Sequence, residues 1–321
     1  MWEIIRYESS MSGRWDEFVG NARNATFLFC RGYMDYHAER FEDHSLLALK
    51  NGKLRALLPA NITSDGVLHS HQGLTYGGWI LPKAHFDATD MLEMWDAWLA
   101  YCANNGIIAV DYKPLPWIYA SRPSQEDIYA LFRCGAVQDA VNLSSTICLG
   151  DNPGFDTTRR RHLRQATASG CVVEETDDCE AFMALVESCL RERHGVAPVH
   201  TAQEMRLLKD RFPERIRMFV ARLDDEIHAG VMVYDTGIVA HGQYISSTAE
   251  GRRLNLLTPL FHKLIFETFA DRRYFDFGIS NEDNGRYLNG PLLHSKATMG
   301  ATGVAYPHYM IKVSESIIRR P

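Results

Sequence analysis

The sequence predicts an α+β fold made of two similar domains, and three observations carry this prediction. The order strand, tight turn, strand, strand, amphipathic helix, strand occurs twice, over 46–114 and again over 218–280. This period is far too long for a solenoid repeat, so it indicates two domains. Consecutive strands joined by tight turns favour antiparallel pairing, with helices packed on the sheets. The Gly- and Pro-containing segment 150–155 reads as a linker, which places the domains at 1–150 and 151–321.

Each element of the first domain has a local signal. Asn51-Gly52 between two apolar runs predicts a hairpin, and Ser124 with Asp127 is typical of a helix capping motif. The remaining expectations are a strand at 2–7, a helix from Ser12, a long strand or strand pair at 67–81, a helix at 88–105, a buried strand at 107–112 and a closing strand at 137–149.

The second domain is expected to repeat this plan after an additional helical segment. Asp224-Asp225 marks its hairpin turn. In chain order we expect a basic helix at 157–170, a strand at 171–176, helices at 179–195 and 201–212, the hairpin, a third strand from 238, a helix from 257, a strand at 274–280, a loop leading into a helix, and a final strand at 304–313.

Two pairs of polar residues occupy matching positions in the repeat. His69 corresponds to His241, and Asp111 corresponds to Asp276. A carboxylate inside an apolar strand must be paired or functional, because burying it alone is costly. Its recurrence in both copies favours a structural duty over catalysis, such as holding a loop or an arginine.

Composition excludes several classes of protein. The net charge of −6 argues against a DNA-binding surface. The seven cysteines show no CxxC spacing, so neither a zinc site nor another metal site is expected. The start of the chain does not read as a signal peptide and no window is long and apolar enough for a membrane span, so we expect a cytoplasmic protein.

One segment carries a family resemblance. Phe275-Asp276-Phe277-Gly278 follows the long helix, Lys296 stands four residues before Gly300, and Tyr306 and Tyr309 follow. This pattern resembles the Fem-type branch of the GNAT superfamily, the general-control-related N-acetyltransferases. The resemblance implies tandem acyltransferase domains, an acyl-CoA-type donor such as acetyl-CoA, and an amine acceptor that is a small molecule or a peptidoglycan precursor.

The resemblance and the residues together suggest a site in the second domain. The family's pyrophosphate loop corresponds to 247–257 here, and only Gly251 matches it securely, whereas the first domain has no such loop. Arginine suits phosphate, as does a helix N-terminus. The candidate donor-binding residues are Gly251, Arg252, Arg253, Asn255, Leu256, Ser280 and Asn281.

Four residues are candidates for the chemistry, which must remove a proton from the amine and polarise the acyl carbonyl. They are Lys296, Tyr244, Glu282 and His241. Strand alternation predicts that His241 and Tyr244 point to opposite faces of their strand. Packing is the alternative role for His241, and a solvated surface position is the alternative for Glu282 and Lys296.

Three functions stay open from the sequence. The first is an N-acyltransferase that uses acyl-CoA. The second is an aminoacyl-tRNA-dependent transferase of the peptidoglycan-bridge type, which the basic run 159–164 would serve but the overall charge does not favour. The third is a non-catalytic binding protein on a GNAT-like fold, which the incomplete phosphate loop supports.

Overall fold

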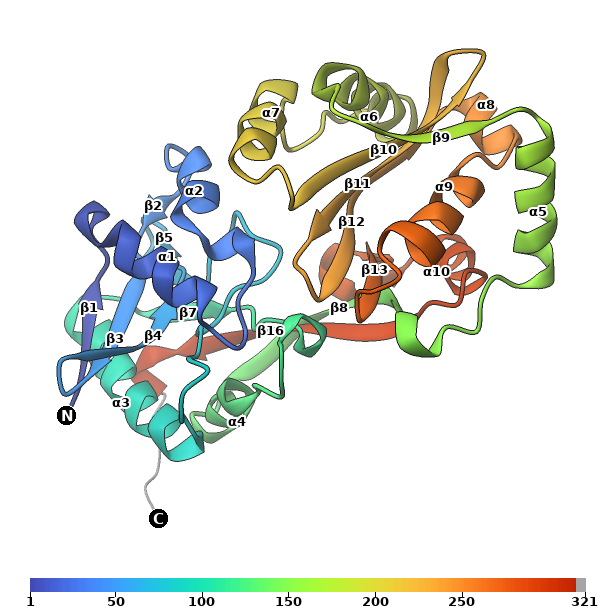
Figure 1. Ribbon diagram of the computed structural model, residues 1–321. Coiled ribbons are helices and arrows are strands. Elements are labelled where there is room, and N and C mark those ends of the chain that lie inside the picture. The colour runs from blue at the N-terminus through green and yellow to red at the C-terminus, as the bar shows by residue number, and fades with distance from the viewer. Residues whose placement is uncertain (316–321) are drawn as a thin grey trace. The chain divides into compact units, whose positions relative to one another are not determined.

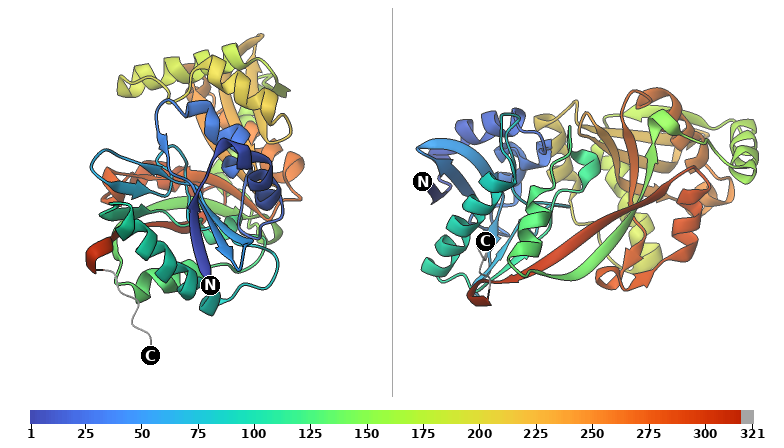
Figure 2. Two further views of the ribbon diagram at one scale, coloured as in Figure 1. Left: turned by 90° about the vertical axis from the view of Figure 1, so that its left-hand side faces the viewer. Right: turned by 90° about the horizontal axis from the view of Figure 1, so that it is seen from below.

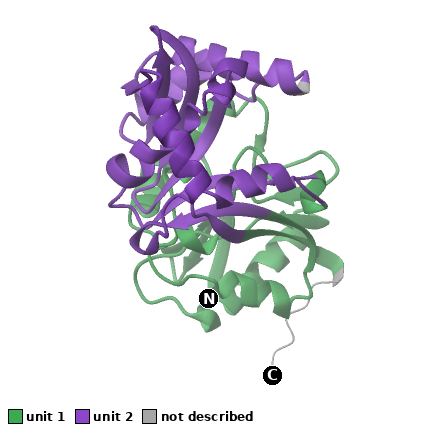
Figure 3. Ribbon diagram, turned by 90° about the vertical axis from the view of Figure 1, so that its right-hand side faces the viewer, with its two compact units in different colours: residues 1–142, 283–286, 305–321 green, residues 143–282, 287–304 purple. Residues whose placement is uncertain are grey.

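The structure, a computed structural model, describes residues 1–315 and consists of two compact units (Figure 3). Unit 1 comprises residues 1–142, 283–286 and the described part of 305–321, and unit 2 comprises 143–282 and 287–304. The chain therefore first passes from unit 1 to unit 2 between residues 142 and 143, whereas the sequence predicted the boundary at 150/151. The last strand returns to unit 1, although the sequence placed it in the second domain. Residues 316–321 lie outside the described residues.

Unit 1 combines two sheets with helices (Figure 1). One sheet has the order β1-β3-β4, and the other contains β2-β5-β6-β7 with β16 beside β7. The bounds are β1 (Trp2–Arg6), α1 (Ser12–Gly20), α2 (Arg31–Met34), β2 (Glu42–Asp43), β3 (Leu46–Lys50), β4 (Lys53–Leu58), β5 (Asn61–Ile62), β6 (Val67–His69), α3 (Ala88–Asn104), β7 (Ala109–Tyr112), α4 (Glu126–Arg133), and parts of β8 (Val137–Cys148) and β16 (Thr302–Lys312).

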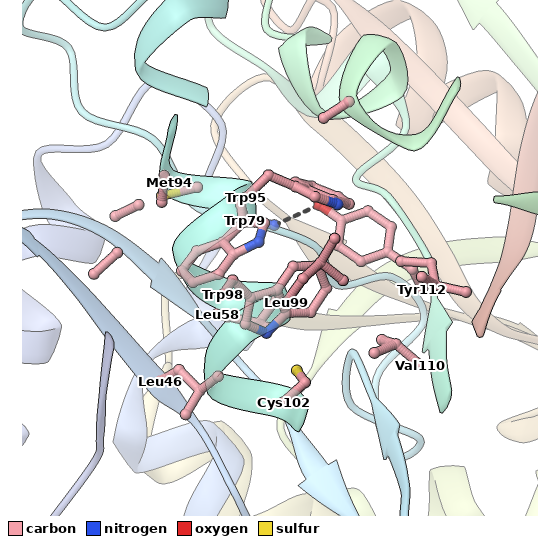
Figure 4. Packing of buried hydrophobic residues seen from close by; sticks show 14 of the residues in the cluster. Leu46, Leu58, Trp79, Met94, Trp95, Trp98, Leu99, Cys102, Val110 and Tyr112 are labelled. Carbon is pink, nitrogen blue, oxygen red and sulfur yellow. Dashed lines mark hydrogen bonds between the residues drawn. The ribbon is translucent and has the colours of Figure 1, made fainter. Parts of the chain in front are cut away.

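The core of unit 1 is rich in tryptophan (Figure 4). Trp95 and Trp98 of α3 pack edge to face, and Trp79 packs in the same way on Trp98. The Tyr112 hydroxyl accepts a hydrogen bond from the Trp79 backbone N–H at 2.8 Å. Burying such side chains stabilises the unit by about 1.5–3 kcal/mol each. Helices α3 and α4 lie side by side (Figure 2).

The main sheet of unit 2 has helices on both faces (Figure 1). Its strand order is β8-β13-β12-β11-β10-β9. The bounds are α5 (Thr157–Ala168), β9 (Val172–Thr176), α6 (Cys179–His194), α7 (Ala202–Arg211), β10 (Ile216–Leu223), β11 (Glu226–Asp235), β12 (Val239–Ser247), α8 (Ala249–Arg253), α9 (Leu257–Lys263) continued by a π-helical turn (Leu264–Thr268), β13 (Tyr274–Ile279), β14 (Asn281–Glu282), β15 (Tyr287–Leu288) and α10 (Gly290–Ala297).

The predicted α+β class is confirmed, and both predicted hairpins form. Asn51 and Gly52 have φ of 53° and 75°, and Asp224 and Asp225 have φ of 48° and 65°. Positive φ at both central residues is what a type I′ turn requires, and it matches the twist of the strands.

Two local predictions for the first domain are wrong. The segment expected as a strand at 67–81 is a strand only over Val67–His69, because the chain then folds back across the end of β7. The Ser124 cap does not form either. Gln125 precedes the first residue of α4, and the Ser124 hydroxyl accepts a hydrogen bond from Arg23 Nε at 2.7 Å instead.

The two units share part of their strand pairing: two antiparallel pairs followed by a parallel pair, although in unit 1 the first antiparallel pair belongs to a separate sheet. In unit 1, β3–β4 and β5–β6 pair antiparallel and β6–β7 pair parallel. In unit 2, β10–β11 and β11–β12 pair antiparallel and β12–β13 pair parallel. Each parallel pair ends at a histidine opposite an aspartate, His69 with Asp111 and His241 with Asp276.

Candidate active site

The candidate site lies where β12 and β13 separate. These strands pair over three positions only, the last being His241 with Asp276. Beyond it, β12 continues beside β11 to Ser247, whereas β13 pairs with β8. Within residues 1–315, the edge of β12 from Gly242 onward therefore has no strand partner on the β13 side. Unpaired backbone N–H and C=O groups can hold an extended ligand, as an added strand would be held.

The His241–Asp276 pair stands at this point of separation. His241 Nδ1 lies 2.9 Å from Asp276 Oδ2, and the Asp276 side chain is completely buried. The other carboxylate oxygen accepts hydrogen bonds from Ser144 Oγ at 2.5 Å and Thr146 Oγ1 at 2.9 Å, both on β8. A carboxylate held in this way orients an imidazole and stabilises its protonated form. The pair is therefore suited to accepting a proton.

A β-bulge places Tyr244 on the same face as His241, so the expectation of opposite faces is wrong. His241 is opposite Tyr234 and Tyr244 is opposite Met232, with one extra residue, Gln243, inserted between these pairs. Tyr234 and Met232 are two residues apart in β11, so their side chains point to the same face of the sheet. Residues directly opposite each other in paired strands also point to the same face, so His241 and Tyr244 lie on one face.

The Tyr244 hydroxyl has a defined partner. It lies 2.7 Å from Nδ1 of His200, in the loop before α7. Burial raises the pKa of Tyr244 to about 12, so this hydroxyl keeps its proton at neutral pH and can serve as a donor.

Gly278 and Lys296 complete the surroundings of the pair. Gly278 has φ of 76°, and a side chain there would extend toward His241. The Lys296 amine donates hydrogen bonds to the carbonyl oxygens of Gly278 and Ile279, both at 2.8 Å. Burial lowers the pKa of Lys296 to about 8, while the nearby Asp276 charge acts in the opposite direction.

Residues of the predicted donor-binding loop already contact other residues of the protein. A Cβ on Gly251 would overlap the His228 carbonyl oxygen, so this glycine is required by packing within the protein. Arg252 donates to the Ser247 carbonyl at 2.6 Å and pairs with Glu192 at 3.1 Å. Arg253, which is more exposed, pairs with Glu250. A phosphate would have to compete with these carboxylates for both arginines.

The other sequence-predicted residues are distributed around this loop and the end of β13. Asn255 adopts a left-handed conformation with φ of 58°, and Leu256 is fully buried in the core. The Ser280 hydroxyl lies 3.3 Å from that of Ser145. Asn281 Oδ1 accepts a hydrogen bond from the Leu143 backbone N–H at 2.6 Å, which ties it to β8. Glu282 is exposed and accepts a longer hydrogen bond from Asn289 at 3.4 Å.

Sequence reasoning missed the hydroxyl groups that hold Asp276 and the residue that holds Tyr244. Ser144, Ser145 and Thr146 are consecutive in a strand, and this run of hydroxyls was the available signal. His200 carries no pattern of its own, because its partner lies 44 residues away. Only the fold brings it to Tyr244.

Unit 1 contains the same kind of pair, but the space beside it is filled by the protein's own chain. His69 Nδ1 lies 3.0 Å from Asp111 Oδ2. However, the next residues fill the space between the strands: Ser70 N–H donates to the Asp111 carbonyl, and Gly77 N–H donates to the Lys113 carbonyl. Lys113, which corresponds to Gly278 in register, donates its amine to the carbonyls of His71 and Leu74 at 3.1 Å. Unit 1 thus occupies with its own chain the space that unit 2 leaves unpaired.

Two kinds of feature are absent from residues 1–315. No cluster of three or more His, Cys, Asp or Glu side chains in the described part of the chain could hold a metal ion. No helix within residues 1–315 is both long enough and apolar enough to span a bilayer.

Comparisons with known proteins identify the class of domain and the fold. Residues 155–287 match the family model described as an acetyltransferase (GNAT) domain. The structure of FemX is similar with a TM-score of 0.68 and 12% identity, covering 96% of each chain. A tandem GNAT protein from the clavulanic acid biosynthesis pathway is similar with a TM-score of 0.54 and 11% identity, covering 98% of this chain and 99% of its own.

A third structure, L-PGS from Bacillus licheniformis, has a TM-score of 0.59 and 10% identity, covering 96% of this chain and 97% of its own. Comparison with curated proteins gives no sequence match. At these identities the structural likeness shows the fold. The expected fold is confirmed: the chain has a tandem GNAT fold similar to that of FemX.

Proposed function

We propose that unit 2 transfers an acyl group from an acyl-CoA-type donor to an amine, with His241 accepting the proton of the amine. The observation that carries the proposal is the His241–Asp276 pair at the start of the unpaired edge of β12. The match of a GNAT domain model to residues 155–287 supports an acyltransferase of this class. The proposed acceptor is a small molecule or a peptidoglycan precursor with a primary amine.

The residues have separate tasks in this proposal. The unpaired edge of β12 orients the acyl arm of the donor through backbone hydrogen bonds. As the amine nitrogen attacks the acyl carbon, His241 takes its proton and the buried Asp276 carboxylate stabilises the imidazolium. Tyr244 can donate a hydrogen bond to the leaving thiolate sulfur, because it shares the face of His241 and keeps its proton at neutral pH.

The donor-binding part of the proposal rests on α8 and its neighbourhood. Arg252 and Arg253 stand one turn after the end of β12, and arginine binds phosphate through paired hydrogen bonds. Their present partners, Glu192 and Glu250, lie on the surface of the unit. Exposed ion pairs are worth little, about 0–1 kcal/mol, so a phosphate group can replace them.

An aminoacyl-tRNA donor is the second candidate, and α5 favours it. Arg160, Arg161 and Arg164 are exposed on this helix, and none of them forms an ion pair within the described residues. Such a patch attracts a polyanion even on a protein whose net charge is −6.

Calorimetry separates these donors. Acetyl-CoA should bind the unaltered protein with an affinity that the Arg252→Ala, Arg253→Ala variant weakens. Release of CoA thiol in the presence of a panel of primary amines should then depend on His241. Binding of tRNA without binding of acetyl-CoA would transfer the donor role to the tRNA. Binding of acetyl-CoA without release of CoA thiol in the presence of any amine would favour a non-catalytic binding protein.

A further inference from the structure

Helix α10 buries a lysine where an apolar residue is expected. Lys296 is 5% exposed and is the one buried side chain of Gly290–Ala297, whereas Leu292 on the same helix is 43% exposed. Lysine is almost never buried unless it is paired with an opposite charge. Within residues 1–315, Lys296 forms no ion pair, and its amine donates hydrogen bonds to the two backbone carbonyls of Gly278 and Ile279. Packing alone does not explain a lysine at this position, since leucine would bury more apolar surface at lower cost.

The amine of Lys296 stands beside the proposed proton acceptor. Gly278, whose carbonyl it binds, also borders His241, because a Cβ on Gly278 would contact the imidazole at 3.5 Å. Lys296 is also close enough to Asp276 to interact with its charge. The amine, the imidazole and the carboxylate are therefore gathered around one residue of β13, at the point where β13 leaves β12.

Burial also makes this amine chemically competent. The pKa of Lys296 falls from 10.5 to about 8, which gives a roughly 300-fold larger neutral fraction at pH 7 than an ordinary lysine has. Only the neutral amine has the lone pair needed to attack an acyl carbon.

We propose that Lys296 is itself an acyl acceptor, so that the protein modifies its own α10 when an acyl-CoA-type donor is bound and no external amine is present. This inference rests on the proposed function of unit 2. The Nζ lone pair forms a bond to the acyl carbon, and the thioester carbon–sulfur bond breaks. His241 takes the proton that Nζ loses, and the sulfur leaves as the thiolate of CoA. The product is a neutral amide on Lys296.

The modification would change the site that makes it. An amide nitrogen has one N–H, so it cannot donate to the carbonyls of both Gly278 and Ile279 as the ammonium does. It also carries no charge to interact with Asp276. Because an amide is stable in water, the acylated form accumulates and does not turn over, and we expect it to transfer acyl groups to external amines more slowly than the unmodified protein.

The test uses the full-length protein with acetyl-CoA as the probe and no added amine. Intact-mass measurement should show a gain of one acetyl group, and peptide mapping should place it on Lys296. Lys263 is the matched control, since its amine also donates to a backbone carbonyl, that of Val173 at 3.1 Å, but has no contact with the His241–Asp276 pair. Acetylation of Lys296 should be at least about tenfold faster than that of Lys263, as a neutral amine is required. Unfolded protein should lose this preference.

Two variants and a binding measurement make the outcomes distinct. Lys296→Arg should abolish the single adduct, and His241→Gln should slow its formation while the protein still binds acetyl-CoA in calorimetry. Binding of acetyl-CoA with no adduct on Lys296, or with equal labelling of Lys296 and Lys263, would overturn the inference and leave the proposed function intact. Absence of acetyl-CoA binding to the unaltered protein would overturn both.

Discussion

Replacing Asp276 by Asn is the sharpest test of the proton acceptor in unit 2. The substitution keeps the size of the side chain and removes its charge. Asp276 accepts hydrogen bonds from Ser144, Thr146 and His241, and it is fully buried. An Asn side chain has one acceptor oxygen and an NH2 group, so it cannot serve all three donors. His241 then loses either its orientation or its tautomer.

The expected loss follows from the role of the pair. A positioned general base contributes about 10²–10⁴-fold to the rate, so kcat/KM should fall by that factor, or about 3–5 kcal/mol of transition-state stabilisation. The free energy of unfolding should also fall, by about 1–3 kcal/mol, because a buried donor is left without its acceptor. Urea denaturation measures this second effect separately, so a loss of folded protein is not mistaken for a loss of activity.

The repeat supplies a matched control. Asp111→Asn removes the same carboxylate from the equivalent register of unit 1, where His69 lies at 3.0 Å. The space beyond that pair is occupied by the protein's own chain. Thiol release from acetyl-CoA in the presence of an accepted amine should therefore stay within about threefold of the unaltered protein in this variant, as for a change worth under 1 kcal/mol. Full activity of Asp276→Asn, or a larger loss in Asp111→Asn, would refute the reasoning.

Three further outcomes are expected. Gly251→Ala should lower the free energy of unfolding by at least about 1 kcal/mol in urea denaturation, since its Cβ would overlap the His228 carbonyl, and an unchanged midpoint would contradict that. The Arg252→Ala, Arg253→Ala variant should bind CoA at least tenfold more weakly in calorimetry, or about 1.4 kcal/mol, while Lys83→Ala should bind normally. Burial raises the pKa of Asp127 from 3.8 to about 6. The folded state therefore holds this proton more tightly than the unfolded state, and stability from this group should fall by up to about 3 kcal/mol as pH rises from about 3 to about 7. Asp127→Asn should lack that pH dependence, and identical pH profiles would show that Asp127 does not titrate as inferred.

Much of the fold was readable in the sequence, because local signals and tertiary packing agree there. Asn51-Gly52 and Asp224-Asp225 determine their turns through backbone conformations that few other residues adopt. The repeat also predicted which histidine corresponds to which, and the register of β6–β7 and β12–β13 places them equivalently. Agreement failed at 67–81, where the apolar pattern of a strand is present but the chain closes over the end of β7 instead.

By itself, the sequence determined the α+β class, the doubled plan and the residues that could carry the chemistry. The tertiary structure decided how those residues combine. The bulge at Gln243 brings Tyr244 to the face of His241, a one-residue shift in pairing that no periodicity reveals. The tertiary structure also decided which unit has an unpaired strand edge. In unit 1 the space beyond the His–Asp pair is filled by Lys113 and by the chain after β6, whereas in unit 2 the equivalent residue is Gly278, which has no side chain to fill it. Strand register and burial depend on contacts between segments distant in the chain, and local sequence carries no record of them.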